Sequence, residues 1–110
     1  MKEKSIGKIT HCYFGFGGYQ DVMIGFSFNF DTESGGVGDF WGTWNCEPDK
    51  HTKWTKDSQI RYLGESVLRA SKVMADAKVS RFKDLVGKPV EVSWDGNALK
   101  EWRILTEVIL

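Results

Sequence analysis

The chain has 110 residues, of which 41% are hydrophobic and 27% are charged, a balance typical of a folded domain and not of a disordered chain or collagen. Fifteen Lys and Arg residues match fifteen Asp and Glu residues, so bulk electrostatic attraction gives no reason to expect binding to nucleic acid or to a membrane. We therefore expect one domain over residues 1–110, with a core that needs no disulfide or structural metal.

Period-two alternation in the first half predicts three strands, over residues 5–14, 21–30 and 40–44. The second is the clearest, because apolar side chains from Val22 to Phe30 alternate with small or polar ones. Gly15–Gly18 is expected to end the first strand in a turn that accepts positive φ angles. A loop over residues 31–39 is expected before the third strand, and residues 45–54 form a connection.

The second half predicts one long helix over residues 56–78, begun by Thr55 as N-cap. Its expected buried stripe has spacings of three and four and consists of Ile60, Leu63, Val67, Ala70, Met74 and Ala77. Gly64 lies in mid-helix, where Ala would be better by ~1 kcal/mol, which indicates close backbone contact there.

A short second helix is expected from Ser80 to Gly87, where Gly87 and Pro89 prevent continuation. Two final strands, over residues 89–94 and from Leu99 to about Ile109, surround a hairpin turn. The order β-β-β-α-α-β-β predicts an α+β fold, with an antiparallel sheet of about five strands and one long helix packed on one face.

Charge is balanced in sum but not along the chain. Residues 9–49 contain six acidic side chains and no Lys or Arg, whereas residues 50–61 hold four basic side chains and one acidic one. One interpretation is that these charges only keep the surface soluble. The other is an acidic, aromatic surface over residues 14–21 and 31–46 that meets a partner protein with a basic surface.

Aromatic residues surround glycines near residues 14–19 and 38–44, and Trp and Tyr in such loops often dominate interfaces. We predict that Phe16, Tyr19 and Trp41 are exposed on one side, although such rings also commonly fill a core. The partner-binding residues predicted on this basis are Phe16, Tyr19, Asp31, Glu33, Asp39, Trp41 and Trp44.

A second hypothesis is a nucleotide or single-stranded nucleic-acid binding module, in which the aromatics stack on bases. Its phosphate contacts would be Lys50, Lys53, Lys56 and Arg61. The glycine-rich segments lack a following helix N-terminus, so a phosphate-binding loop is not expected. A third hypothesis is a structural subunit of a phage assembly.

The chemistry-bearing side chains do not form a recognisable catalytic or metal-binding pattern. His11, Cys12, Cys46 and His51 are metal-ligand types, but neighbouring residues of a strand point to opposite faces, so we expect no metal and two small apolar cysteines. A calcium loop beginning at Asp31 would need a carboxylate where Gly42 stands. The sequence therefore predicts a protein that is not an enzyme and holds no cofactor.

The N-terminal segment shows no apolar run typical of a signal peptide, and the longest mostly apolar stretch is too short to span a membrane. Two cysteines do not make a disulfide framework. The expected location is therefore the cytoplasm, with both thiols reduced.

Five segments carry a resemblance to a family of small uncharacterised bacteriophage and prophage proteins. They are FGFGGYQD at residues 14–21, GVGDFWGTW at 36–44, KWT at 53–55, GKPVEV at 87–92 and GNALKEWRILTEV at 96–108. The resemblance assigns no activity and no catalytic residue.

The resemblance implies a phage-encoded accessory protein in the cytoplasm of a bacterial host. Proteins of this size and origin often act by occupying a host protein, including defence systems such as CRISPR effectors. The function expected from the sequence is therefore non-enzymatic binding to a host or phage protein, as a monomer or homodimer, with an anti-defence or other inhibitory role.

Overall fold

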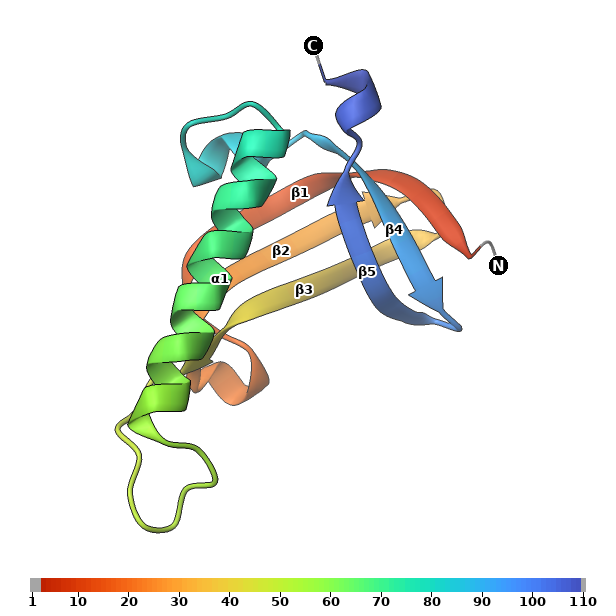
Figure 1. The fold of residues 1–110 in the computed structure, drawn as a ribbon. Helices are drawn as coiled ribbons and strands as arrows, with labels where there is room; N and C mark the ends of the chain where they lie inside the picture. The colour runs from red at the N-terminus through yellow and green to blue at the C-terminus, as the bar shows by residue number, and fades with distance from the viewer. Residues whose placement is uncertain (1–2, 110) are drawn as a thin grey trace.

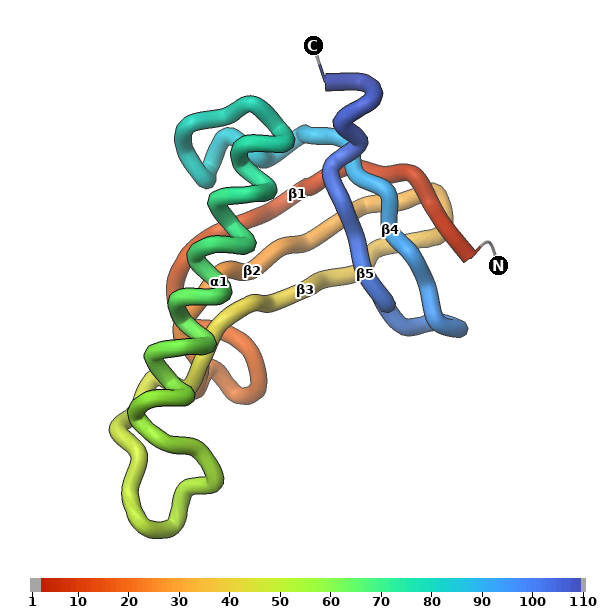
Figure 2. The backbone as a smooth tube through the Cα atoms, in the orientation of Figure 1, coloured from red at the N-terminus to blue at the C-terminus, as the bar shows by residue number. Residues whose placement is uncertain are grey.

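The computed structural model describes residues 3–109 as one antiparallel five-stranded sheet with one α-helix packed on it (Figures 1 and 2), which confirms the predicted α+β class. The strands are β1 (Lys4–Gly17), β2 (Met23–Thr32), β3 (Gly35–Trp44), β4 (Pro89–Asp95) and β5 (Ala98–Ile104). The helix is α1 (Lys56–Asp76), and three short 3-10 helices are η1 (Tyr19–Asp21), η2 (Phe82–Leu85) and η3 (Thr106–Val108).

The sheet has the order β3-β2-β1-β4-β5, and its central strand β1 is shared between two neighbours. β1 pairs with β2 from Gly7 to Gly17, with a bulge at Thr10, but it pairs with β4 only from Lys4 to Lys8. Figure 1 shows the β4–β5 hairpin crossing in front of the first three strands. The core is therefore enclosed by β1–β3, by this hairpin and by α1.

The core consists of the side chains that alternate inward along these strands. In β2 the predicted apolar face is confirmed for Phe28 and Phe30, which are buried with apolar residues from β1, β3, η2, β4 and β5. The largest fully buried apolar side chains are Phe28, Ile9, Leu85, Ile104, Val90 and Val92.

Helix α1 begins where the sequence predicts. Thr55 Oγ1 accepts a hydrogen bond from Ser58 N at 3.1 Å, and Thr55 N donates to Ser58 Oγ at 3.0 Å, which completes a capping box. The predicted buried stripe is only partly correct, because Ser66 and Ala70 are buried whereas Ile60 and Val67 are exposed. The helix packs mainly on β3 and is rotated away from the stripe that sequence spacing favoured.

Several predicted boundaries are wrong, because pairing between distant segments outweighs local glycine and capping signals. The first strand continues through Gly15–Gly17, and residues 35–39 belong to β3 and not to a loop. The expected second helix is only the 3-10 turn η2, where Phe82 packs against Phe26 and Phe28. The last strand ends at Ile104 and is followed by η3.

Three glycines form a row across β1, β2 and β3. Gly25 of β2 pairs with Gly15 of β1 and with Gly42 of β3. A Cβ atom added at Gly25 would overlap the Trp41 carbonyl oxygen, so no larger residue fits without moving backbone. In contrast, a Cβ at Gly64 of α1 meets nothing within 4 Å, so the expected close contact there is wrong.

We expect Gly25→Ala to lower the free energy of unfolding by about 3 kcal/mol, because the new methyl group collides with the β3 backbone. The matched control Gly64→Ala should raise it by about 0.5–1 kcal/mol, since the open helix position gains propensity. Urea unfolding followed by circular dichroism measures both values. Equal effects of the two substitutions would contradict the tight β2–β3 approach.

Candidate functional site

The residues predicted to bind a partner do not form one surface. Phe16 and Tyr19 are 64% and 71% exposed, as predicted, and they lie where β1 turns into η1 and β2. Asp31 and Glu33 lie at the opposite end of β2, about 26 Å away at 3.3 Å per residue. The Glu33 carboxylate also accepts a hydrogen bond from Ile6 N at 3.3 Å.

The prediction that Trp41 is exposed is wrong, since the side chain is only 7% exposed. Its ring stacks on Trp102 of β5, with 5.4 Å between ring centroids and 11° between planes. The register places Trp41 opposite Phe26, on the face of β3 that packs inward, so its pairing decides its burial.

Asp39 is partly buried, and its carboxylate is engaged within the chain. Its carboxylate accepts hydrogen bonds from Trp41 Nε1 at 3.0 Å and from Trp102 Nε1 at 2.9 Å. The same carboxylate accepts a third bond from Phe40 N at 2.9 Å. Because β3 and β5 are the two outermost strands, this carboxylate joins opposite edges of the curled sheet.

On the side of α1 that faces the outer edge of β3, a positively charged side chain covers the ring of Trp41. The Arg69 guanidinium carbon lies 4.1 Å from the centre of the Trp41 ring, a distance typical of a cation–π contact. Nearby, Lys72 Nζ lies 2.9 Å from Asp76 Oδ2. This side of the helix is therefore charged, and the hollows beside it, of about 230 and 210 Å³, are lined in part by charged side chains such as Glu65, Arg69 and Lys72.

The residues assigned to the nucleic-acid hypothesis are partly engaged within the chain. Lys56 Nζ lies 2.7 Å from Glu47 Oε1, and the Arg61 guanidinium carbon lies 5.1 Å from the centre of the Tyr62 ring. Lys50 and Lys53 are exposed in the segment that leads to α1.

Trp44, the remaining aromatic of the predicted partner surface, is half-buried. Its ring stacks on Trp54, with 6.2 Å between centroids and 11° between planes. One face of Trp44 is therefore used inside the chain, which leaves less of the ring for a base or a partner.

The four possible metal ligands are not brought together. Among residues 3–109, no group of three or more His, Cys, Asp or Glu side chains is arranged to hold an ion. Cys12 donates to the Phe82 carbonyl oxygen at 3.3 Å, and burial raises the pKa of this thiol. Cys12 is therefore a half-buried packing group, whereas Cys46 is exposed, so the expectation of an apolar packing role is wrong for Cys46.

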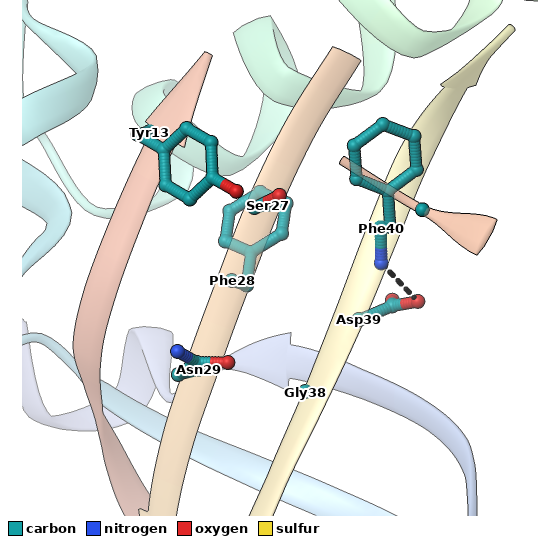
Figure 3. Close-up of a pocket in the computed structure, with 8 residues that line it drawn as sticks. Tyr13, Ser27, Phe28, Asn29, Gly38, Asp39 and Phe40 are labelled. Atoms are coloured by element: carbon teal, nitrogen blue, oxygen red, sulfur yellow. Dashed lines mark hydrogen bonds between the residues drawn. The ribbon is translucent and has the colours of Figure 1, made fainter. Parts of the chain in front are cut away.

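A hollow on the face opposite the helix, of about 380 Å³, carries no catalytic arrangement. Figure 3 shows the Tyr13 ring beside Ser27, with Phe40 on the other side of β2 and the Phe28 ring beneath the strand. Asp39 lines the hollow, but its carboxylate is held by the two indoles and Phe40 N. The hollow is shallow and has no unpaired charge.

An apolar cleft that the sequence patterns did not predict lies between α1 and Phe26 of β2. It has a volume of about 450 Å³, and its lining includes Phe26, Val67, Ala70 and Met74. Phe14 lies beside it, 53% exposed, with its ring 4.9 Å from that of Phe26. We call this surface, with Phe14 and Phe16 on the neighbouring face of β1, the β1-side cleft.

One sequence signal for this cleft is the width of the apolar arc on α1. Val67 and Leu68 are exposed although Ser66 and Ala70 already supply the buried face. A helix that needs only one buried stripe would carry polar residues at these positions.

The chain matches no family model, no curated protein and no solved structure in comparisons with known proteins. In residues 3–109, no helix is both long enough and apolar enough to cross a membrane.

We expect Asp39→Ala to lower the free energy of unfolding by about 2–3 kcal/mol, because two indole N–H groups lose their acceptor. The control Asp31→Ala, at an exposed position, should change it by less than about 0.5 kcal/mol. Urea unfolding monitored by tryptophan fluorescence measures both. A stable Asp39→Ala protein with unchanged fluorescence would contradict the structural role of this carboxylate.

Proposed function

We propose that this chain acts by binding another protein, without catalysis, and that the β1-side cleft is its binding surface. The observation that carries the proposal is the exposure of large apolar side chains, including Phe14, Phe16 and Val67, around one open cleft. Monomeric proteins rarely leave contiguous apolar surface of this kind exposed unless it binds something.

The cleft suits an apolar side chain of a protein better than a polar small molecule. No charged side chain is among the residues that line it, which are Phe26, Val67, Ala70, Ser71, Met74, Ala75 and Val79. Residues 9–20, in and just after β1, also contain no Lys, Arg, Asp or Glu. Aromatic and aliphatic anchors that fill such pockets supply most of the energy at protein interfaces.

The proposed partner is a host or phage protein, and occupying it would inhibit it. The support for this context is the resemblance of five sequence segments to small bacteriophage and prophage proteins. The acidic residues once expected to select a basic partner are dispersed, with Asp39 used internally. We therefore propose that apolar fit, and not a continuous acidic face, selects the partner.

The nucleic-acid and assembly-subunit hypotheses have less support. Nucleic-acid binding would need free stacking rings beside free cations, whereas Trp41 is buried and Lys56 is paired with Glu47. An assembly subunit would need an extended contact surface that forms a large oligomer, and a single cleft does not require one.

The test is affinity capture from a bacterial lysate at low and moderate salt, followed by mass spectrometry. We expect one protein to be retained by the wild-type chain and at least tenfold less by Val67→Glu, which places a charge in the cleft. The matched control Val108→Glu, at an exposed position in η3, should retain it fully.

Both variants should keep the melting temperature of the wild-type protein, because Val67 and Val108 are exposed. Absence of any specifically retained protein at both salt concentrations would contradict the proposed function. Equal retention by the Val67→Glu and wild-type chains would exclude the cleft as the surface.

A further inference from the structure

Strand β1 has an open edge in the middle of the sheet. β4 pairs with β1 only as far as Lys8, and the chain before β4 then covers the edge as far as Cys12. Gly87 N donates to the Ile9 carbonyl oxygen at 2.7 Å, and the Cys12 thiol donates to the Phe82 carbonyl oxygen at 3.3 Å. Among residues 3–109, no strand pairs with the edge from Tyr13 to Gly17.

This edge lacks the features by which strands normally avoid pairing with other chains. Natural edge strands carry Lys, other charges or Pro, or are very short. Residues 9–20 contain no Lys, Arg, Asp, Glu or Pro. Exposed aromatic side chains stand there instead, namely Tyr13, Phe14 and Phe16.

We propose that a second copy of this chain pairs with Tyr13–Gly17 in the antiparallel direction, which forms a closed dimer with one continuous ten-stranded sheet. The two-fold axis would pass through the sheet beside Gly15, the centre of the open segment. Because such an axis is perpendicular to the sheet, both helices lie on the same side of it.

The side chains of this register are complementary. Phe14 and Phe16 lie on the helix side of β1, since they pair with Phe26 and Ile24 of β2. Centring on Gly15 places Phe14 directly across from the partner's Phe16, so two aromatic cross-strand pairs form on that face. On the other face, the Tyr13 ring lies over Gly15 of its own chain and beside Ser27, and its hydroxyl donates to the Phe16 carbonyl oxygen at 3.2 Å. Pairing with a second copy would replace this side-chain bond with a backbone one.

The ends of the open segment carry opposite charges. Asp21 lies in η1, just beyond Gly17, whereas η2, which covers Cys12 at the other end, carries a net positive charge from Arg81 and Lys83 against the acidic Asp84. Asp21, Arg81 and Lys83 are all exposed, and none of these three forms an ion pair among the described residues. Antiparallel pairing brings η1 of each copy beside η2 of the other, so charge favours a second copy of this chain as the occupant.

The area available predicts a dimer of moderate strength. Tyr13, Phe14, Phe16 and Tyr19 are about half exposed or more, which amounts to roughly 400 Å² per copy at about 200 Å² for each ring. A standard stable interface buries about 800 Å² per partner. Backbone pairing and η1–η2 contacts add to this area, so we expect self-association at micromolar protein concentrations.

The dimer would cover Phe14 and Phe16, which border the β1-side cleft, but it leaves the lining of the cleft on α1 uncovered. In the dimer both clefts open on the same side of the sheet, and Val67 lies on α1, outside the pairing segment. Val67→Glu should therefore impair capture of a partner and leave the dimer intact. Loss of one property without the other identifies which proposal fails.

The first test is sedimentation equilibrium from micromolar to millimolar concentration. We expect the wild-type chain to approach twice its mass of 12.5 kDa and no higher oligomer, with Phe14→Lys and Phe16→Glu each associating at least about tenfold more weakly. An equimolar mixture of these two variants should restore the dimer, because Lys at one position faces Glu at the other. The charge-matched control Val108→Lys should associate as the wild type does.

The second test needs no substitution and applies even if those variants unfold. Amide hydrogen exchange at residues 13–17 of the wild-type chain should slow as protein concentration rises, while exchange in β3, an outer strand of the sheet, stays constant. A monomer at millimolar concentration would overturn the proposal. So would a dimer that protects β3 or β5 instead, or one unaffected by both Phe variants and not restored by mixing.

Discussion

The carboxylate of Asp39 is the interaction that determines how the sheet closes. It accepts hydrogen bonds from Trp41 of β3 and from Trp102 of β5, the first and last strands of the sheet order. The two indoles stack, and Arg69 lies over Trp41, so carboxylate, rings and guanidinium form one layered cluster. This cluster seats α1 against β3 and seals that side of the core.

On the side of α1 that faces β1, apolar side chains are exposed instead of being covered by such a cluster. Both proposals rest on this difference between the two sides of the helix. The helix presents Val67 and Leu68 there, while Phe14 and Phe16 of β1 are left half exposed or more. Burying the exposed part of each ring against a second molecule would add roughly 1 kcal/mol of hydrophobic stabilisation. The cleft and the open edge of β1 adjoin each other. In the two proposals the cleft binds apolar side chains of a partner protein, and the open edge pairs with the backbone of a second copy.

Local patterns predicted the fold class, the alternation of β2 and the capping box at Thr55, because these depend on neighbouring residues. The site depended on pairing between distant residues and was less predictable. Trp41 and Asp39 resembled surface residues in a glycine-rich segment, and only their contact with Trp102, more than sixty positions away, makes them internal. Likewise, the open edge exists because β4 departs from β1 after Lys8, which no local signal marks.

The central claim is that the chain works by adhesion through the side of the molecule between β1 and α1. Its most direct test is amide hydrogen exchange on the complex with a captured partner, compared with the free protein. The account predicts slower exchange at residues 60–75 of α1, and also at residues 13–17 of β1 when the free protein is compared at a concentration low enough to be monomeric. Protection confined to the β2–β3 turn or to the β4–β5 hairpin would contradict it.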